Sequence, residues 1–233
     1  MKSTLLALAL LAGSVPAFAV TAAPSTIAQW TFETSQPTTY GLFSPETGLG
    51  SASGYHAGTS TYSSPAGNGS AHSFSSNTWA VGDYYQFKTS TTGFTGITVS
   101  WDQISSNTGP KDFSLLYSTD GINFSSAIPS YTVLANSTPN TWSTATPIST
   151  SSYSFDFSGI TALDNQSAVY FRLRYLDMIS ANGSTVAAGG TDRVDNFTVS
   201  AIAIPEPSTY ALLAGVATLA VVVMRRKARA NAA

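Results

Sequence analysis

The stretch Ile97-Thr98-Val99-Ser100-Trp101-Asp102 decides the fold class of this chain. Large apolar residues occupy every second position, and hydroxyl or acidic residues lie between them. Successive side chains of a β-strand point to opposite faces, so this period of two predicts a strand with one buried and one solvated face. The same alternation recurs at residues 113–117, 153–157 and 171–175. The chain therefore reads as a β protein.

Turn residues separate these alternating stretches. Ser118-Thr119-Asp120-Gly121 predicts a tight hairpin, because Asp-Gly supplies the positive φ that such a turn requires. About ten strands within a region of about 180 residues favour an all-β fold, an antiparallel two-sheet sandwich of jelly-roll type. The remaining predicted strands cover residues 27–33, 71–75, 84–88, 131–134, 141–148 and 194–200.

Residues 34–70 depart from this pattern, since they are rich in Gly, Ser, Thr and Pro with isolated aromatic residues. We predict a long surface loop here. A disordered linker is the alternative, because loops beyond about 15 residues are uncommon in compact domains.

The composition excludes several classes of protein and site. Only 9% of the 233 residues are charged, against roughly 25% in an ordinary soluble domain, while 43% are hydrophobic. Disordered chains are poor in apolar residues, so disorder of the whole chain is excluded. The absence of cysteine excludes disulfides, thiolate zinc sites and cysteine nucleophiles.

The charge of the central region argues against polyanionic partners. Between Pro24 and Ala203 there are five basic and eleven acidic side chains, a net charge of −6. Such a domain is expected to repel polyanionic glycans, and it gives no reason to expect nucleic acid as a partner.

The first 19 residues have the three parts of a secretory signal peptide. Lys2 is followed by the apolar run Leu5 to Ala12 and by the small-x-small site Ala17-Phe18-Ala19. A membrane-anchoring helix is the competing reading, but the run is about half of the ~20 residues that a span needs. We expect signal peptidase to remove residues 1–19, which leaves residues 20–203 as the exported domain.

The C-terminal end also has three parts in order. Pro205-Glu206-Pro207 precedes an apolar stretch from Ala211 to Met224, which is followed by Arg225, Arg226, Lys227 and Arg229. A helix over residues 208–224 would be about 26 Å long, just short of a ~30 Å hydrocarbon core. We predict a transmembrane helix, oriented by the basic cluster, which keeps the end of the chain in the cytoplasm and the domain outside.

Residues 204–233 resemble the PEP-CTERM sorting signal of Gram-negative bacteria, in which these three parts occur together at the C-terminus. The resemblance implies an exosortase as partner, cleavage near Pro205-Glu206-Pro207, and export through the inner membrane to the cell surface or an exopolysaccharide matrix. A plain single-pass anchor is the alternative, although such anchors usually have a longer span.

The central region carries a second resemblance, to the recurrent ectodomain of PEP-CTERM proteins, which is similar in outline to jelly-roll carbohydrate-binding modules and laminin-G-like sandwiches. Its motifs are mostly turns and core strands, so they indicate the fold and say little about a ligand. They are Gly67-Asn68-Gly69-Ser70, Trp79, Gly82-Asp83-Tyr84, Trp101-Asp102, Tyr117 to Gly121, Tyr170 to Leu173 and Arg193 to Phe197.

We predict that the protein is not an enzyme. A serine triad needs a histidine, and His56 and His72 both lie in Ser/Gly-rich surroundings without a Gly-x-Ser-x-Gly turn. Paired carboxylates for glycoside hydrolysis stay open, because their separation is a property of the fold.

A structural or adhesive role is the first expectation for the domain, and a carbohydrate-binding module for an exopolysaccharide is the alternative. Sugar rings stack on aromatic faces, and arginine adds a planar fork of donors. Aromatic residues of a sandwich more often fill its core. The candidate glycan contacts are Trp79, Tyr84, Trp142, Tyr170 and Arg172.

A structural Ca²⁺ ion is the one cofactor considered. The first and last strands of a jelly roll commonly lie side by side, which would bring Glu33 close to Asp195. By period two, Asp195 shares an apolar face with Phe197, where an unpaired carboxylate is costly. Calcium accepts such carboxylate ligands. The rival is a backbone cap or an ion pair with Arg172, Arg174 or Arg193.

Overall fold

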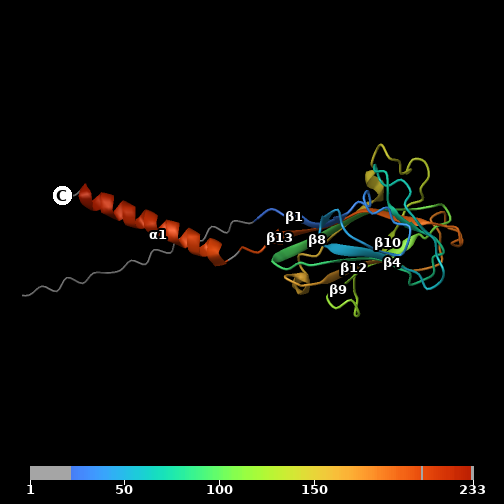
Figure 1. Cartoon of the computed structure of the whole chain (residues 1–233), viewed down its shortest axis with the longest axis horizontal. Helices are drawn as coiled ribbons and strands as arrows, with labels where there is room; N and C mark the ends of the chain where they lie inside the picture. Colours follow the sequence, from blue (N-terminus) through green and yellow to red (C-terminus); the bar gives the residue numbers. More distant parts are fainter. Residues whose placement is uncertain (1–21, 206, 232–233) are drawn as a thin grey trace, which may run out of the picture.

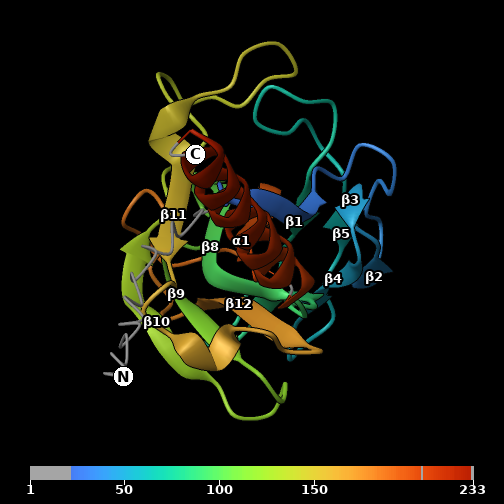
Figure 2. The same cartoon turned by 90° about the vertical axis from the view of Figure 1, so that its left-hand side faces the viewer.

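The computed structural model describes residues 22–205 and 207–231, so the signal peptide predicted at residues 1–19 lies outside the described residues. Two β-sheets pack face to face, and one long helix, α1 (Pro207–Ala230), extends away from one end of them (Figure 1). Figure 2 looks along this helix onto the end of the two layers.

The first sheet has seven strands. The central path runs β11-β8-β13-β1-β3, with β6 beside β13 and β5 beside β6. All of its pairings are antiparallel. The strands are β1 (Ser25–Trp30), β3 (Thr47–Gly48), β5 (Tyr62–Ser63), β6 (Phe74–Ser76), β8 (Phe94–Ser105), β11 (Ser152–Asp156) and β13 (Asp192–Ala203).

The second sheet has six strands in the order β10-β9-β12-β7-β4-β2, again antiparallel throughout. Two single-turn helices, η1 (Ser149–Ser151) and η2 (Thr161–Leu163), lie in the connections. The strands are β2 (Gly41–Phe43), β4 (Gly50–Tyr55), β7 (Tyr84–Thr89), β9 (Asp112–Ser118), β10 (Ser125–Thr132) and β12 (Val169–Tyr175). The antiparallel two-sheet sandwich of jelly-roll type is confirmed.

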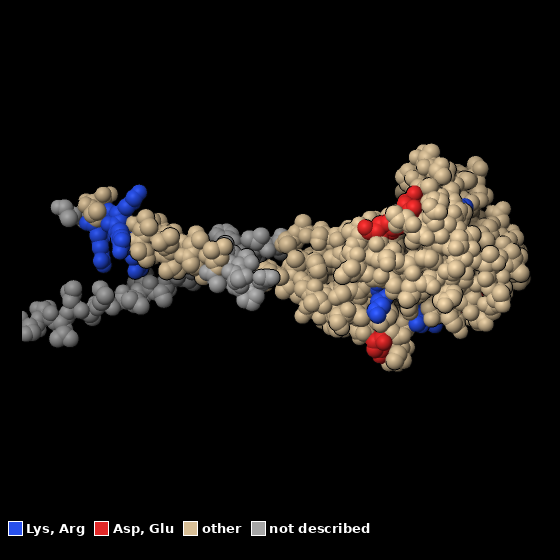
Figure 3. All heavy atoms as spheres, in the orientation of Figure 1, with Lys and Arg blue, Asp and Glu red and all other residues tan. Residues whose placement is uncertain are grey.

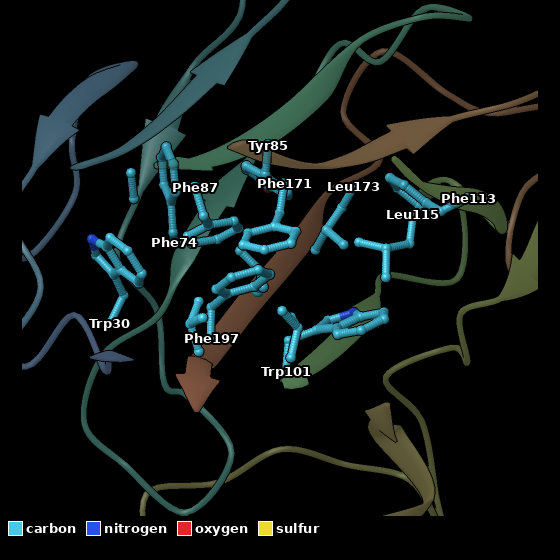
Figure 4. Close-up of a cluster of buried hydrophobic side chains, with 14 of the residues drawn as sticks. Trp30, Phe74, Tyr85, Phe87, Trp101, Phe113, Leu115, Phe171, Leu173 and Phe197 are labelled. Atoms are coloured by element: carbon cyan, nitrogen blue, oxygen red, sulfur yellow. The ribbon is translucent and has the colours of Figure 1, made fainter. Parts of the chain in front are cut away.

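The core lies between the sheets and consists largely of aromatic rings (Figure 4). Ile97, Val99 and Trp101 of β8 are at most 1% exposed, as their alternation predicts. Phe87 of the second sheet stacks on Phe197 of the first, with ring centroids 3.6 Å apart. Truncating a core aromatic residue typically costs 3–5 kcal/mol of unfolding free energy, so these rings hold the two layers together.

The first and last strands of the sandwich are neighbours, as expected. β1 pairs with β13 from Ser25–Ala201 to Trp30–Phe197, and β6 continues the same edge of β13 beyond it. Since β8 pairs with the other edge, β13 lies in the interior of its sheet.

The long loop predicted at residues 34–70 is wrong in part, because this segment contains four short strands, β2 to β5. The buried positions of β4 are Ala52 and Gly54, which carry too little apolar bulk to produce a visible alternation. Gly54 is required there, since an added Cβ would lie 2.6 Å from the ring of Tyr62. Small inward residues therefore hid β4.

The strand predicted at residues 141–148 is also wrong: this stretch consists of turns and irregular structure that lead into η1. Pro147 lacks an N–H for a strand ladder. Trp142 anchors the connection instead, since its indole N–H donates to Ser151 Oγ at 2.8 Å.

The C-terminal helix α1 covers residues 208–224, where the sequence predicts a helix. Within residues 22–205 and 207–231, no helix combines the length and the apolar character that crossing a membrane requires. That residues 208–224 cross a membrane stays a prediction.

Candidate functional sites

The C-terminal segment leaves the sandwich directly from its last strand. β13 ends at Ala203, and α1 begins at Pro207. Glu206 lies outside the described residues. The basic side chains of the helix are exposed and gather at its far end, whereas the sandwich surface carries few charges in the same view (Figure 3). This cluster comprises Arg225, Arg226, Lys227 and Arg229.

Two of the five predicted glycan contacts are wrong, because their side chains are buried. Trp79 is 3% exposed and donates its indole N–H to the carbonyl of Ser76 at 3.0 Å. Trp142 is 4% exposed. Trp79 belongs to the aromatic core, where it packs on Tyr85 and Phe113. Neither buried ring presents a face to a sugar.

The other three, Tyr84, Tyr170 and Arg172, do lie together on the outer side of the second sheet. The pairings of β4, β7, β12 and β9 place four rows of three side chains on one face, which we call the outer face. Its residues are Ser51, Ser53 and Tyr55 of β4, Tyr84, Gln86 and Lys88 of β7, Tyr170, Arg172 and Arg174 of β12, and Ser114, Leu116 and Ser118 of β9.

A line of stacked planar groups crosses the outer face. The rings of Tyr55 and Tyr84 are stacked with centroids 5.0 Å apart. The guanidinium of Arg172 lies 4.0 Å from the Tyr84 ring and 3.7 Å from the ring of Phe124, which follows β9. Both sides of the Tyr84 ring are thus covered, so its hydroxyl and edge, more than its face, are available to a ligand.

Tyr170 is enclosed in a similar way. The ammonium of Lys88 lies 5.3 Å from its ring centroid. Gly121 lies against its ring, since an added Cβ there would be 3.0 Å from it. The φ of +73° at Gly121 is the positive φ predicted for this turn. Sugar stacking on Tyr84 or Tyr170 is therefore unfavourable in this arrangement.

Sequence reasoning missed Tyr55, Gln86, Lys88 and Phe124. Period two in residues 84–88 would have placed Gln86 and Lys88 beside Tyr84. Tyr55 lies in the strand hidden by small residues, and Phe124 reaches Arg172 only through the register of the sheet. The contacts of Tyr55 with Tyr84 and of Phe124 with Arg172 could therefore not be predicted from the sequence.

The expectation that Asp195 shares a face with Phe197 is wrong. β13 has a bulge between Asp195 and Thr198, where Asn196 adopts a φ of 51°. The extra residue reverses the alternation, so Asp195 pairs with Asp102 on the outer side of the first sheet while Phe197 points into the core. A β-bulge commonly re-aims a side chain in this way.

The Asp195 carboxylate is capped by hydrogen-bond donors. Its Oδ2 accepts bonds from the N–H of Asn68 at 2.9 Å and from Ser70 Oγ at 2.7 Å, and Oδ1 accepts the N–H of Asn196 at 2.7 Å. Burial nevertheless raises the pKa of Asp195 to about 6, with repulsion from Asp102 adding to it. The motif residues 67–70 and 193–197 thus meet to hold one buried acid.

Glu33 binds the loop of residues 67–72, which also caps Asp195, at a second point. Its carboxylate accepts the N–H of His72 at 2.8 Å and that of Ala71 at 3.3 Å. Donors therefore surround both predicted calcium ligands, where Ca²⁺ would need further oxygen ligands. The described residues contain no group of three His, Asp or Glu side chains suited to a metal ion. The donor sets fit the backbone cap better than the ion.

A hydrogen-bonded Ser-His-Asp chain lies elsewhere in the molecule. His56 Nε2 is 3.0 Å from Ser76 Oγ, and His56 Nδ1 is 2.8 Å from Asp83 Oδ2. This order of contacts matches that of a serine-hydrolase triad. Ser76 is only 1% exposed, and its hydroxyl also contacts the hydroxyl of Tyr85 at 3.0 Å.

Asp83 serves the local backbone as well, since its carboxylate accepts the N–H groups of Ala57 and Ala80. Burial lowers the pKa of His56, and Asp83 opposes this shift. We interpret the chain as a tie between the ends of β4 and β6 and the start of β7.

Two of the shallow hollows on the described surface are considered as sites, and neither includes Ser76, His56 or Asp83. One adjoins the outer face and is lined by Leu49, Gly50, Ser51, Lys88, Thr89, Ser90 and Ser167. The other lies over the first sheet, between Thr98, Ser100, Ser154, Asp156 and Ser200.

Residues 203–227 match the PEP-CTERM protein-sorting motif, which confirms the resemblance of the C-terminal segment. The motif implies export and processing by an exosortase. A search of curated proteins finds no match to the chain.

Several solved structures are similar to this chain. The CBM22-1–GH10 modules of xylanase 10B from Clostridium thermocellum, complexed with xylohexaose, match at 11% identity and a TM-score of 0.46, over 76% of this chain and 28% of that one. The CBM22-2 xylan-binding domain of Paenibacillus barcinonensis Xyn10C matches at 12% and 0.41, over 75% and 99%. The K1 cleaved adhesin domain of Lys-gingipain from Porphyromonas gingivalis W83 matches at 13% and 0.43, over 76% and 98%. These values concern strand arrangement alone.

Proposed function

Starting from the sorting motif at residues 203–227, we propose that this protein is a structural or adhesive component of the cell surface or exopolysaccharide matrix of a Gram-negative bacterium. An exosortase releases it from its C-terminal segment. The observation that carries the proposal is the position of the motif immediately after β13, the last strand of the sandwich.

Cleavage near Pro205 would leave the sandwich whole. All thirteen described strands end at or before Ala203. Ile204 and Pro205 lie outside both β13 and α1. Proline lacks an N–H and disfavours helix at the residue before it, which keeps Ile204 out of a helix and open to an enzyme. The processed product would therefore be a complete folded domain.

The surface and the buried polar groups support a role without catalysis. Ser and Thr make up 65 of the 233 residues, and few charges cover the sandwich. A serine nucleophile must be reached by substrate, whereas Ser76 is buried and shared with Tyr85. We propose that the protein is not an enzyme.

Export and cleavage can be tested in an exosortase-containing host. The triple variant Pro205→Ala, Glu206→Gln, Pro207→Ala should accumulate in the cell envelope with its C-terminal segment attached. The native protein should be recovered at the surface without that segment, as measured by intact mass. A matched control, Gly58→Ala, changes a position with open space around it and should be processed normally. Surface material that still contains residues 225–229 would contradict cleavage.

The non-enzymatic role has its own test. A fluorophosphonate probe, which labels activated serines, should leave the native protein and a Ser76→Ala variant equally unlabelled. Labelling that is lost in Ser76→Ala would contradict the proposal.

A further inference from the structure

The outer face concentrates the positive charge of an acidic domain. Three of the five basic residues of the sandwich, Lys88, Arg172 and Arg174, lie on it. None of its twelve positions is acidic. In the described part of the chain the only ion pair is His56–Asp83, so no carboxylate lies within 4 Å of these three cations.

Arg172 is held ready for a planar anion. Its guanidinium is fixed between the rings of Tyr84 and Phe124, and its Nε donates to Gln86 Oε1 at 2.8 Å. The two terminal nitrogens of this side chain have no hydrogen-bond partner among the described residues. A guanidinium fork of this kind matches a carboxylate, and its immobilisation lowers the entropy lost on binding.

Neutral polar groups surround the charges. Ser51, Ser53, Gln86 and the Tyr84 hydroxyl lie between or beside them, and hydroxyl and amide groups of this kind exchange hydrogen bonds with sugar hydroxyls. The hollow that contains Ser51 and Lys88 continues the face at one edge. Charges spaced by hydroxyls suit a ligand whose anionic groups are likewise separated by hydroxyls.

We infer that the outer face binds a carboxylate-bearing polysaccharide, with a carboxylate on Arg172 and with Lys88 and Arg174 on either side. This inference rests on the proposed surface or matrix role and names what the domain adheres to. It revises the expectation that the domain repels polyanionic glycans. The net charge of −6 is not spread evenly, and this face is locally positive.

Denser polyanions fit less well. Nucleic acid presents a charge at every phosphate and is bound by many cations together, whereas this face offers three. Asp120 lies at its margin, where the Asn123 side chain, the N–H groups of Ile122 and Asn123, and Ser118 Oγ donate to its carboxylate and lower its pKa. A polymer with more closely spaced charges would be repelled more strongly by this carboxylate and by the overall charge of the domain.

The test compares polygalacturonate with the same polymer after full methyl esterification, which removes the charge and keeps the sugar backbone. The purified full chain in detergent should bind polygalacturonate, and raised salt should weaken that binding. Arg172→Gln should weaken binding about 10- to 100-fold, since it removes a charge-assisted fork. Lys111→Gln removes a cation outside the face and should change binding less than twofold.

Several outcomes would overturn the inference. Equal binding of the acid and the ester would show that charge is not recognised. Absence of binding to polygalacturonate or alginate, in a protein that is exported and processed normally, would reject the inference and leave the proposed sorting intact. Tighter binding of double-stranded DNA would identify a merely electrostatic surface. Arg172→Lys keeps the charge without the fork, and native affinity in that variant would exclude the planar pairing.

Discussion

At the scale of the residue, the polar motifs of the sequence make hydrogen bonds that hold the backbone of loops in place, and this role comes before any contact with a ligand. Gly67-Asn68-Gly69-Ser70 closes over Asp195, and Gly82-Asp83-Tyr84 gathers N–H groups from two loops. Buried carboxylates in such sites satisfy donors that would otherwise be unpaired. These motifs therefore mark loop anchors.

Gly67 makes one such anchor possible. A Cβ at this position would collide with Ser70 Oγ, Asp195 Oδ2 and the carbonyl of His72. We expect Gly67→Ala to lower the unfolding free energy by about 1–3 kcal/mol, the usual cost of overpacking. Urea denaturation measures it, with Gly58→Ala as the control that should stay within about 0.5 kcal/mol of the native protein. Equal stability of the two variants would mean that the loop does not pack on Asp195.

Asp195 gives a prediction about pH. Its pKa of about 6 in the folded protein exceeds the usual 3.8, so between these values the folded state binds more protons than the unfolded state. Stability from this group is present below pH 4 and is lost as pH rises toward 6, by up to about 3 kcal/mol. Asp195→Asn removes the titration. The unfolding free energy of the native protein minus that of the variant should therefore fall from pH 4 to pH 6. A value that stays constant with pH would refute this prediction.

At the scale of the element, alternation of large apolar residues predicted β8, β9, β11 and β12, and Asp120-Gly121 predicted the hairpin after β9. Alternation failed where the period was hidden or broken. β4 buries Ala52 and Gly54, which carry little hydrophobic signal, and Asn196 adds one residue to β13. The outer face escaped prediction for a related reason, because its members meet through sheet register and not through sequence spacing.

The His56 tie joins β4, β6 and β7. Because burial lowers its pKa below 6.5 in the folded state, the unfolded state takes up protons first as pH falls. We expect stability from His56 to be present above pH 6.5 and to be lost below it, with the sign opposite to that of Asp195. His56→Gln should remove this loss, as measured by denaturant midpoints at pH 7.5 and pH 5. An unchanged midpoint shift in the variant would assign the loss to another group.

At the scale of the whole molecule, the sandwich and the sorting segment are separable. Because every strand ends by Ala203, truncation after Ile204 should leave the thermal midpoint of the sandwich within about 2 °C of that of the full chain, measured by circular dichroism. A larger fall would mean that α1 contributes to the folded domain.

The interior position of β13 matters once the protein is held at its C-terminal end. Its hydrogen bonds to β8 and to β1 and β6 run across the strand. Tension applied at Ala203 acts along the strand, and so it loads these bonds together in shear instead of peeling them one by one. When a cell adheres through this domain under flow, the pulling force would therefore act on β13, the strand of the sheet that separates last.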